Sequence, residues 1–170
     1  MGDWLVTAGL TETGVTTRPR AYAHRLWAEF TTSVGPINAE FLLVRFDEAI
    51  TAAGAPVAIS YDATRGLWVA EQTFAAALAY SFAGITLVTG YAQGDYGYIQ
   101  VKGPNVVTMQ STAAMTAGLG VQHSAAADTK VKEVAAATTA DYMKTFGTLL
   151  KAQAGAGTIG VGELAIHGRF

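Results

Sequence analysis

The sequence contains no cysteine and few charged residues. With no Cys among its 170 residues, disulfide-stapled scaffolds, thiolate metal sites and cysteine nucleophiles are excluded. Lys, Arg, Asp and Glu make up only 14% of the chain, whereas about 25% is typical of a globular domain. A surface with so little charge favours a protein that neighbouring molecules partly cover.

An excess of positive charge is also missing. The 11 basic and 13 acidic side chains give a net charge of −2, and no basic cluster occurs, which argues against a nucleic-acid-binding protein. Asp3 stands where a signal peptide needs positive charge. The uncharged stretch 72–94 is long enough to span a membrane. However, it holds polar side chains and interior glycines and lacks flanking Lys and Arg, so we expect no membrane partner.

Motifs that carry catalytic or cofactor chemistry are scarce. Residues 155–160 read G-x-G-x-x-G, but a dinucleotide site needs a helix after this loop. The few residues that follow alternate like a strand, so we interpret the glycines as a hairpin turn. His24, His123 and His167 are too far apart in the chain to form a local metal-binding motif.

The only adjacent carboxylates, Asp47 and Glu48, would point to opposite faces of a strand, and we interpret them as a solvated strand end. We therefore predict that the protein is not an enzyme and has no catalytic, cofactor-binding or metal-binding residues.

Short apolar or alternating segments follow one another from residue 41 onward, separated by Gly, Pro, Asn and Asp. The pattern in 96–102 is typical of a half-buried strand, and Gly103-Pro104-Asn105 has the chemistry of a turn. These segments predict an all-β domain: a single β-barrel or β-sandwich of about eight short, mainly antiparallel strands. The predicted strands are 41–46, 57–61, 67–69, 84–91, 96–102, 106–109, 146–151 and 158–166, the last two joined through Gly155–Gly157.

The N-terminal segment differs from the rest, and we predict an extended arm over 1–38 and a β domain over 39–170. Tyr22, Leu26 and Phe30 suit one face of a short helix, but the same stretch alternates like a strand, and both alternatives stay open. The large aromatic residues of the arm need a surface to cover them, either that of a partner or that of the chain's own β domain. The candidate partner-binding residues are Trp4, Leu5, Arg18, Arg20, Tyr22 and Trp27.

Aromatic residues also cluster in the β domain. Tyr91, Tyr96 and Tyr98 with Trp68 could form a stacking face for sugars or bases. Tyrosines at alternating positions also stabilise a sheet through cross-strand pairs, and we favour that interpretation.

Several tracts of the chain carry a resemblance to a known group of proteins. They are Ala39–Val44, the Gly-Ala-Pro-Val step into Ile59–Asp62, Thr89–Gln93, Gly94–Gly103 and Gly162–Phe170. With these tracts, the chain resembles the head decoration or cement proteins of tailed bacteriophages, which are small, β-rich virion proteins.

The resemblance implies a non-enzymatic structural protein without a cofactor. Such a protein binds the outside of the phage capsid and stabilises contacts between subunits of the major capsid protein. It implies a homo-oligomer, a dimer or trimer, located on the capsid surface of the virion and in the host cytoplasm during assembly. The alternative is a phage tail or fibre-base β domain that binds carbohydrate or another virion protein. A third hypothesis is a hydrolase with dispersed catalytic residues.

Overall fold

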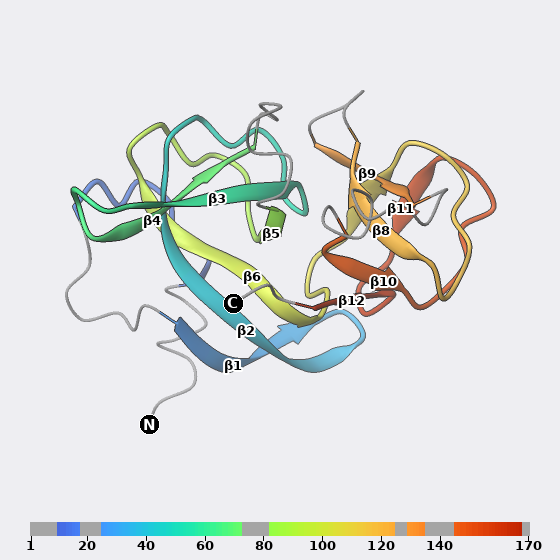
Figure 1. Ribbon diagram of the computed structural model, residues 1–170. Coiled ribbons are helices and arrows are strands. Elements are labelled where there is room, and N and C mark those ends of the chain that lie inside the picture. The colour runs from blue at the N-terminus through green and yellow to red at the C-terminus, as the bar shows by residue number, and fades with distance from the viewer. Residues whose placement is uncertain (1–9, 18–24, 73–81, 125–128, 135–144, 168–170) are drawn as a thin grey trace.

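The computed structural model describes residues 10–17, 25–72, 82–124, 129–134 and 145–167 (Figure 1). These residues form an all-β fold, as predicted, with one sheet of twelve strands. The strands are β1 (Arg25–Thr32), β2 (Gly35–Phe46), β3 (Pro56–Asp62), β4 (Leu67–Glu71), β5 (Phe82–Thr86), β6 (Tyr96–Pro104), β7 (Met109–Ser111), β8 (Gly120–His123), β9 (Lys130–Glu133), β10 (Gly147–Leu149), β11 (Gly157–Ile159) and β12 (Leu164–Ile166).

The sheet has the order β1-β2-β4-β3-β5-β6-β12-β10-β8-β9-β7-β11, with a further pairing of β2 with β6. It is not a clean barrel. Among the described strands, only β2 with β4 and β7 with β9 pair in parallel, so the prediction of mainly antiparallel strands is confirmed. The predicted count of about eight is wrong. β8 and β9 were not expected as strands, β1 was one of two alternatives left open, and the predicted strand 158–166 is divided into β11 and β12.

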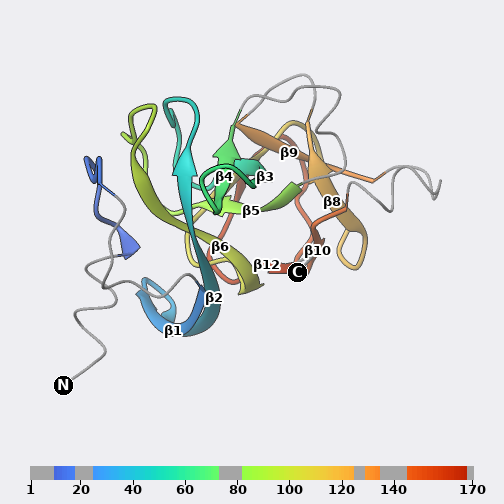
Figure 2. The same cartoon turned by 60° about the vertical axis from the view of Figure 1, so that its left-hand side comes forward.

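Strands β1 to β6 and strands β8 to β12 occupy two neighbouring halves of the molecule (Figure 1). The halves meet where β12 pairs with the end of β6, through Ala165 opposite Pro104 and Ile166 opposite Gly103. In the first half, β2 and β6 run side by side as an antiparallel pair (Figure 2). A β-bulge between Glu40 and Phe41 interrupts this pair.

Three clusters of buried apolar side chains form the core. Two lie in the first half; they include Phe46, Tyr91 and Ile99 in one and Phe41, Leu43 and Tyr98 in the other. The third lies mainly in the second half and contains Phe146, Leu149, Ile159 and Leu164 among others. Alternation along β2 sends Leu42 and Val44 to one cluster of the first half and Phe41 and Leu43 to the other. Because successive strand residues point to opposite faces, β2 separates these two clusters.

Part of the predicted arm packs on the chain's own β domain. Leu10 is fully buried in the cluster that contains Phe41, and the Tyr96 amide donates to the Val15 carbonyl. Residues 25–31 adopt the strand rather than the helix of the two alternatives, and β1 pairs with β2 along its whole length. Of the candidate binding residues, Trp27 lies in β1; Trp4, Leu5, Arg18, Arg20 and Tyr22 lie outside the described residues.

The predicted return strand over 106–109 is wrong, because buried side chains redirect the chain after β6. Gln100 donates to the Pro104 carbonyl and accepts from the Val106 amide. Asn105, fully buried, bonds to the backbone of the second half. The chain therefore leaves β6, and the next strand, β7, pairs with β9 and β11 instead.

The uncharged stretch 72–94 contains the predicted strand 84–91, which is shorter in the structure than expected. The predicted strand 84–91 ends at Thr86 as β5, because the Thr86 hydroxyl donates to the Ala52 carbonyl and its amide to the Ala55 carbonyl. In the part of the chain that the structure describes, no helix is long and apolar enough to cross a membrane. Residues 73–81 of the uncharged stretch lie outside that part.

Candidate functional site

Strand β1 lies at one end of the sheet order and has β2 as its only neighbour in it. Its sequence alternates, so that Leu26, Ala28 and Phe30 pack against the buried cluster while the residues between them face solvent. The ring centroids of Phe30 and Phe41 lie 6.1 Å apart. This apolar inner face explains why the segment joins the sheet. When β1 pairs with β2, its apolar side chains are covered by the neighbouring cluster.

A tight turn fixes the register of β1 against β2. The Thr32 hydroxyl donates to the Gly35 carbonyl and accepts from the Val34 amide. Gly35 has a φ of 114°, a conformation that glycine adopts without steric cost. The turn brings Trp27 opposite Glu40 and Glu29 opposite Asn38.

Trp27 dominates the outer face of this edge. Its side chain is 59% exposed, and the Lys102 ammonium lies 6.0 Å from the centroid of its ring. Trp27, Glu40 and Lys102 form one row across β1, β2 and β6. Glu40 is buried and forms an ion pair with Arg25, which compensates its burial because a buried carboxylate needs a charged partner. The edge therefore presents a large aromatic ring flanked by two cations.

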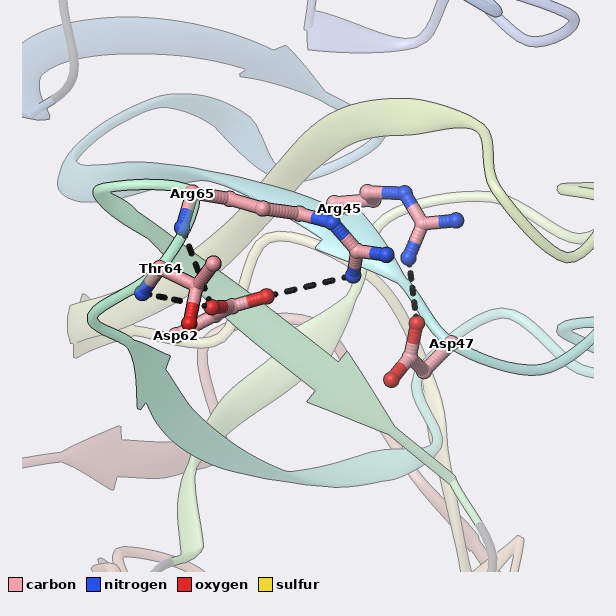
Figure 3. A network of polar contacts seen from close by, with 5 residues as sticks. All are labelled: Arg45, Asp47, Asp62, Thr64 and Arg65. Atoms are coloured by element: carbon pink, nitrogen blue, oxygen red, sulfur yellow. Dashed lines mark hydrogen bonds and ion pairs between the residues drawn. The ribbon is translucent and has the colours of Figure 1, made fainter.

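A second exposed aromatic pair lies on the β3–β4 hairpin. Tyr61 is 55% exposed, and its ring meets that of Trp68 edge-on at a centroid distance of 5.2 Å. The turn beside it is held by Asp62, whose carboxylate accepts from the amides of Thr64 and Arg65 and pairs with the Arg65 guanidinium at 3.1 Å (Figure 3). The rings of Tyr61 and Trp68 therefore form an aromatic surface on a hairpin whose turn is held by hydrogen bonds.

The stacking face of tyrosines, the less favoured of the two sequence interpretations, does not form, because two of its rings are buried. Tyr91 is 1% exposed and Tyr98 is 3% exposed, and they belong to different core clusters. Tyr91 stacks on Phe46 with centroids 4.3 Å apart. Both rings serve packing. Tyr98 faces Leu43 of β2, as the cross-strand interpretation expects, whereas Tyr91 lies outside the strands.

Acidic residues gather where β2 and β4 end. Arg45 forms an ion pair with Asp47 (Figure 3). Burial raises the pKa of Glu71, and the charges of Glu48 and Asp47 raise this pKa further. Among the described residues, no group of three His, Asp or Glu side chains could hold a metal ion.

The glycine motif and two of the histidines occupy structural positions. Gly157–Ile159 form β11 and pair with β7, and the Gly160 amide donates to the Glu163 carboxylate at 2.7 Å. No helix follows the motif in the described residues, so the geometry of a dinucleotide loop is missing. His123 is buried in β8 and His167 is exposed after β12; His24 lies outside the described residues.

Sequence reasoning identified Trp27 but missed its surroundings, which are Arg25, Glu29, Glu40 and Lys102. Alternation over 22–30 was a signal for Arg25 and Glu29, since a strand places them on the face of Trp27. The chain has no significant match to a protein-family model, a curated protein or a solved structure. The function must therefore be argued from the chain itself.

Proposed function

We propose that this protein is a virion structural protein of a tailed bacteriophage, one that binds the outside of the capsid and stabilises contacts between major capsid protein subunits. The observation that carries the proposal is the exposure of Trp27 on an edge strand. Large aromatics set in a well-packed surface are the residues that dominate the energy of protein interfaces. The low charge content and the sequence resemblance support the same function.

A decoration role needs only repeated weak contacts. Copies held on a lattice gain avidity because each bound neighbour raises the effective concentration of the next contact. In the proposal, the β domain is the rigid body, and Trp27 lies in a contact with the coat or with an adjacent copy.

The test uses phage heads assembled without the protein, to which the purified chain is added back. We expect the Trp27→Ser variant to lower the number of copies bound per head. Tyr61→Ser is the matched control, since Tyr61 has nearly the same exposure, 55% against 59% for Trp27, on another strand. We also expect deletion of residues 2–9, which keeps the buried Leu10 in place, to weaken binding. The proposal would be refuted if Trp27→Ser and the deletion variant both bound heads as fully as the parent chain, or if the parent chain did not bind.

A tail or fibre-base domain that binds carbohydrate is the second candidate. Its support is the exposed Tyr61 ring beside Trp68, because sugars stack on accessible aromatic faces. Binding to a glycan array that Tyr61→Ser abolishes and Trp27→Ser leaves intact would favour this candidate over capsid decoration.

A further inference from the structure

Among the described residues, no strand pairs with the outer edge of β1, so this edge is available to a further strand. β1 has eight residues, without Pro, Gly or Lys, and its register with β2 shows no bulge. Edge strands of monomeric proteins are commonly short or carry Lys, Pro or a bulge that blocks further pairing. β11, at the other end of the sheet order, has only three residues. β1 is therefore the edge suited to extension of the sheet.

The charges on β1 are complementary to those of a second copy of the same strand. In an antiparallel pair with a two-fold axis at Trp27, Arg25 of one copy lies opposite Glu29 of the other, twice by symmetry. Leu26 lies opposite Ala28, and the two Trp27 rings face each other. Opposite charges and paired aromatics at facing positions both stabilise antiparallel strands.

Other two-fold registers lose this complementarity. An axis at Glu29 brings two carboxylates together, and an axis at Ala28 places Trp27 opposite Glu29. An axis at Leu26 places Arg25 opposite Trp27 and leaves Glu29 without a charged partner on β1 of the second copy. Like charges at facing positions destabilise a strand pair, so the register at Trp27 is favoured.

The same register keeps the two faces of the sheet consistent. Leu26, Ala28 and Phe30 of both copies stay on the side of the buried cluster, and Arg25, Trp27 and Glu29 of both copies stay on the solvent side. This follows because facing residues of an antiparallel pair project from the same side of the sheet.

We infer that two copies of this chain join through antiparallel pairing of their β1 strands about Trp27, which makes one continuous sheet across the dimer. The inference deepens the proposed function and rests on it for the use of the dimer on a lattice. A strand pair of this length is a small interface, so we expect weak association in solution, which a lattice would strengthen by avidity.

The first test is sedimentation of the purified chain over a range of concentrations, without phage heads. We expect a monomer–dimer equilibrium, and we expect Glu29→Arg to raise its dissociation constant by about tenfold or more, because both facing pairs become repulsive. Glu12→Arg is the control, since it makes the same charge change at an exposed position outside β1. Equal effects of the two variants, or a monomeric parent chain at every concentration, would overturn the inference.

The second test uses the absence of native cysteine to read the register directly. Facing Cα atoms in an antiparallel pair lie about 4.5–5.5 Å apart, within disulfide range. We expect Trp27→Cys to form a disulfide-linked dimer on mild oxidation. Thr31→Cys should not, because its two copies would be about 26 Å apart along the strands. Faster cross-linking of Thr31→Cys than of Trp27→Cys would refute the register.

The outcome for the dimer and for the proposed function can be separated. If the parent chain fills phage heads but is monomeric, or if Glu29→Arg dimerises as strongly as the parent, the β1 pairing is refuted and the proposed function stands. If the parent chain dimerises about Trp27 but does not bind heads, the proposed function is refuted and the strand pairing stands.

Discussion

Removal of the Asn105 side chain should destabilise the protein severely, because its amide forms three hydrogen bonds at the junction of the two halves. Asn105 is fully buried. Its Nδ2 donates to the carbonyls of Val107 at 2.8 Å and Gly160 at 2.9 Å, and its Oδ1 accepts from the Leu164 amide at 2.8 Å. The backbone adds two bonds between the same segments, from the Asn105 amide to the Leu164 carbonyl and from the Gly162 amide to the Asn105 carbonyl.

The cost of Asn105→Ala can be worked from these three side-chain bonds. A buried amide left without an acceptor costs about 2 kcal/mol, and each of the two lost bonds to carbonyls costs about 1 kcal/mol. The sum, about 4 kcal/mol, is a large part of the 5–15 kcal/mol by which a domain is typically stable. Urea unfolding followed by tryptophan fluorescence measures the difference in free energy of unfolding between variant and parent.

Asn105→Asp separates hydrogen bonding from packing, because aspartate has nearly the same shape. Its carboxylate still accepts from Leu164 but cannot donate to Val107 or Gly160. Burial and the two carbonyls raise the pKa of this carboxyl in the folded state. The protonated form is thus the stabler one, so the stability deficit relative to the parent should be largest near pH 7 and shrink as the pH falls toward 4.

Asn38→Ala is the control, since Asn38 is exposed on β2. A loss for Asn105→Ala no larger than that of the control would refute the assignment of Asn105 as the joint between the halves. A deficit of Asn105→Asp that does not change with pH would refute the role of its donated bonds.

Three other predictions concern buried or paired side chains. Tyr91→Phe should raise the free energy of unfolding by about 1 kcal/mol in thermal or urea unfolding, because the buried Tyr91 hydroxyl has no hydrogen-bond partner among the described residues; unchanged or lower stability would contradict this. Gly97→Ala should lower the free energy of unfolding by about 1–3 kcal/mol, because the added methyl group would lie 2.5 Å from Cε1 of Tyr91. In a Tyr91→Leu background the same substitution should cost less. An equal cost in both backgrounds would exclude this clash. Hydrogen bonds from Lys151 and from the Gly160 amide lower the pKa of Glu163. The carboxylate therefore contributes stability above the unfolded pKa of about 4.3, and this contribution is lost as the pH falls through the lower folded pKa. In acid titrations followed by circular dichroism, the parent should lose more stability than Glu163→Gln, and parallel curves would contradict the pairing.

The sequence predicted those strands whose pattern and turn both lie within one short segment. The β3–β4 hairpin is an example, because Val57, Ile59 and Tyr61 alternate and Asp62 and Gly66 close the turn. The alternation of 96–102 likewise predicted β6, but the prediction that this strand is half-buried is wrong, because residues 97–101 are buried on both faces. In these segments the local chemistry of side chains and turn agrees with the final fold.

The sequence did not predict β8 and β9, which lie in a stretch of small and polar residues. Each has four residues, and each is held by its pairing with other strands, as where His123 faces Val131. Similarly, the chemistry of Gly103-Pro104-Asn105 is that of a turn, but two partners of the Asn105 side chain lie more than fifty residues away, at Gly160 and Leu164. Such long-range pairings carry no local sequence signal, which is why the predicted hairpin over 106–109 was wrong.

The candidate site was predictable only in its central residue. A large aromatic in a polar segment identified Trp27, but the cations beside it depend on register. Lys102 reaches the ring because the bulge between Glu40 and Phe41 changes the register with β6, and a bulge cannot be located from alternation alone.

The pairing of Arg25 and Glu29 also depends on secondary structure, because a helix and a strand bring these two side chains to different partners. As a helix, residues 25–29 would place Arg25 and Glu29 on one face of the same chain, four residues apart, where they would pair with each other. As a strand, the two side chains lie two positions apart on one face and are separated by Trp27, so each can meet its counterpart only across an antiparallel neighbour. Residues 25–29 as a strand therefore favour pairing with a second, antiparallel strand of opposite charge order. In the inferred dimer that strand is β1 of another copy, since no described strand pairs with the outer edge of β1.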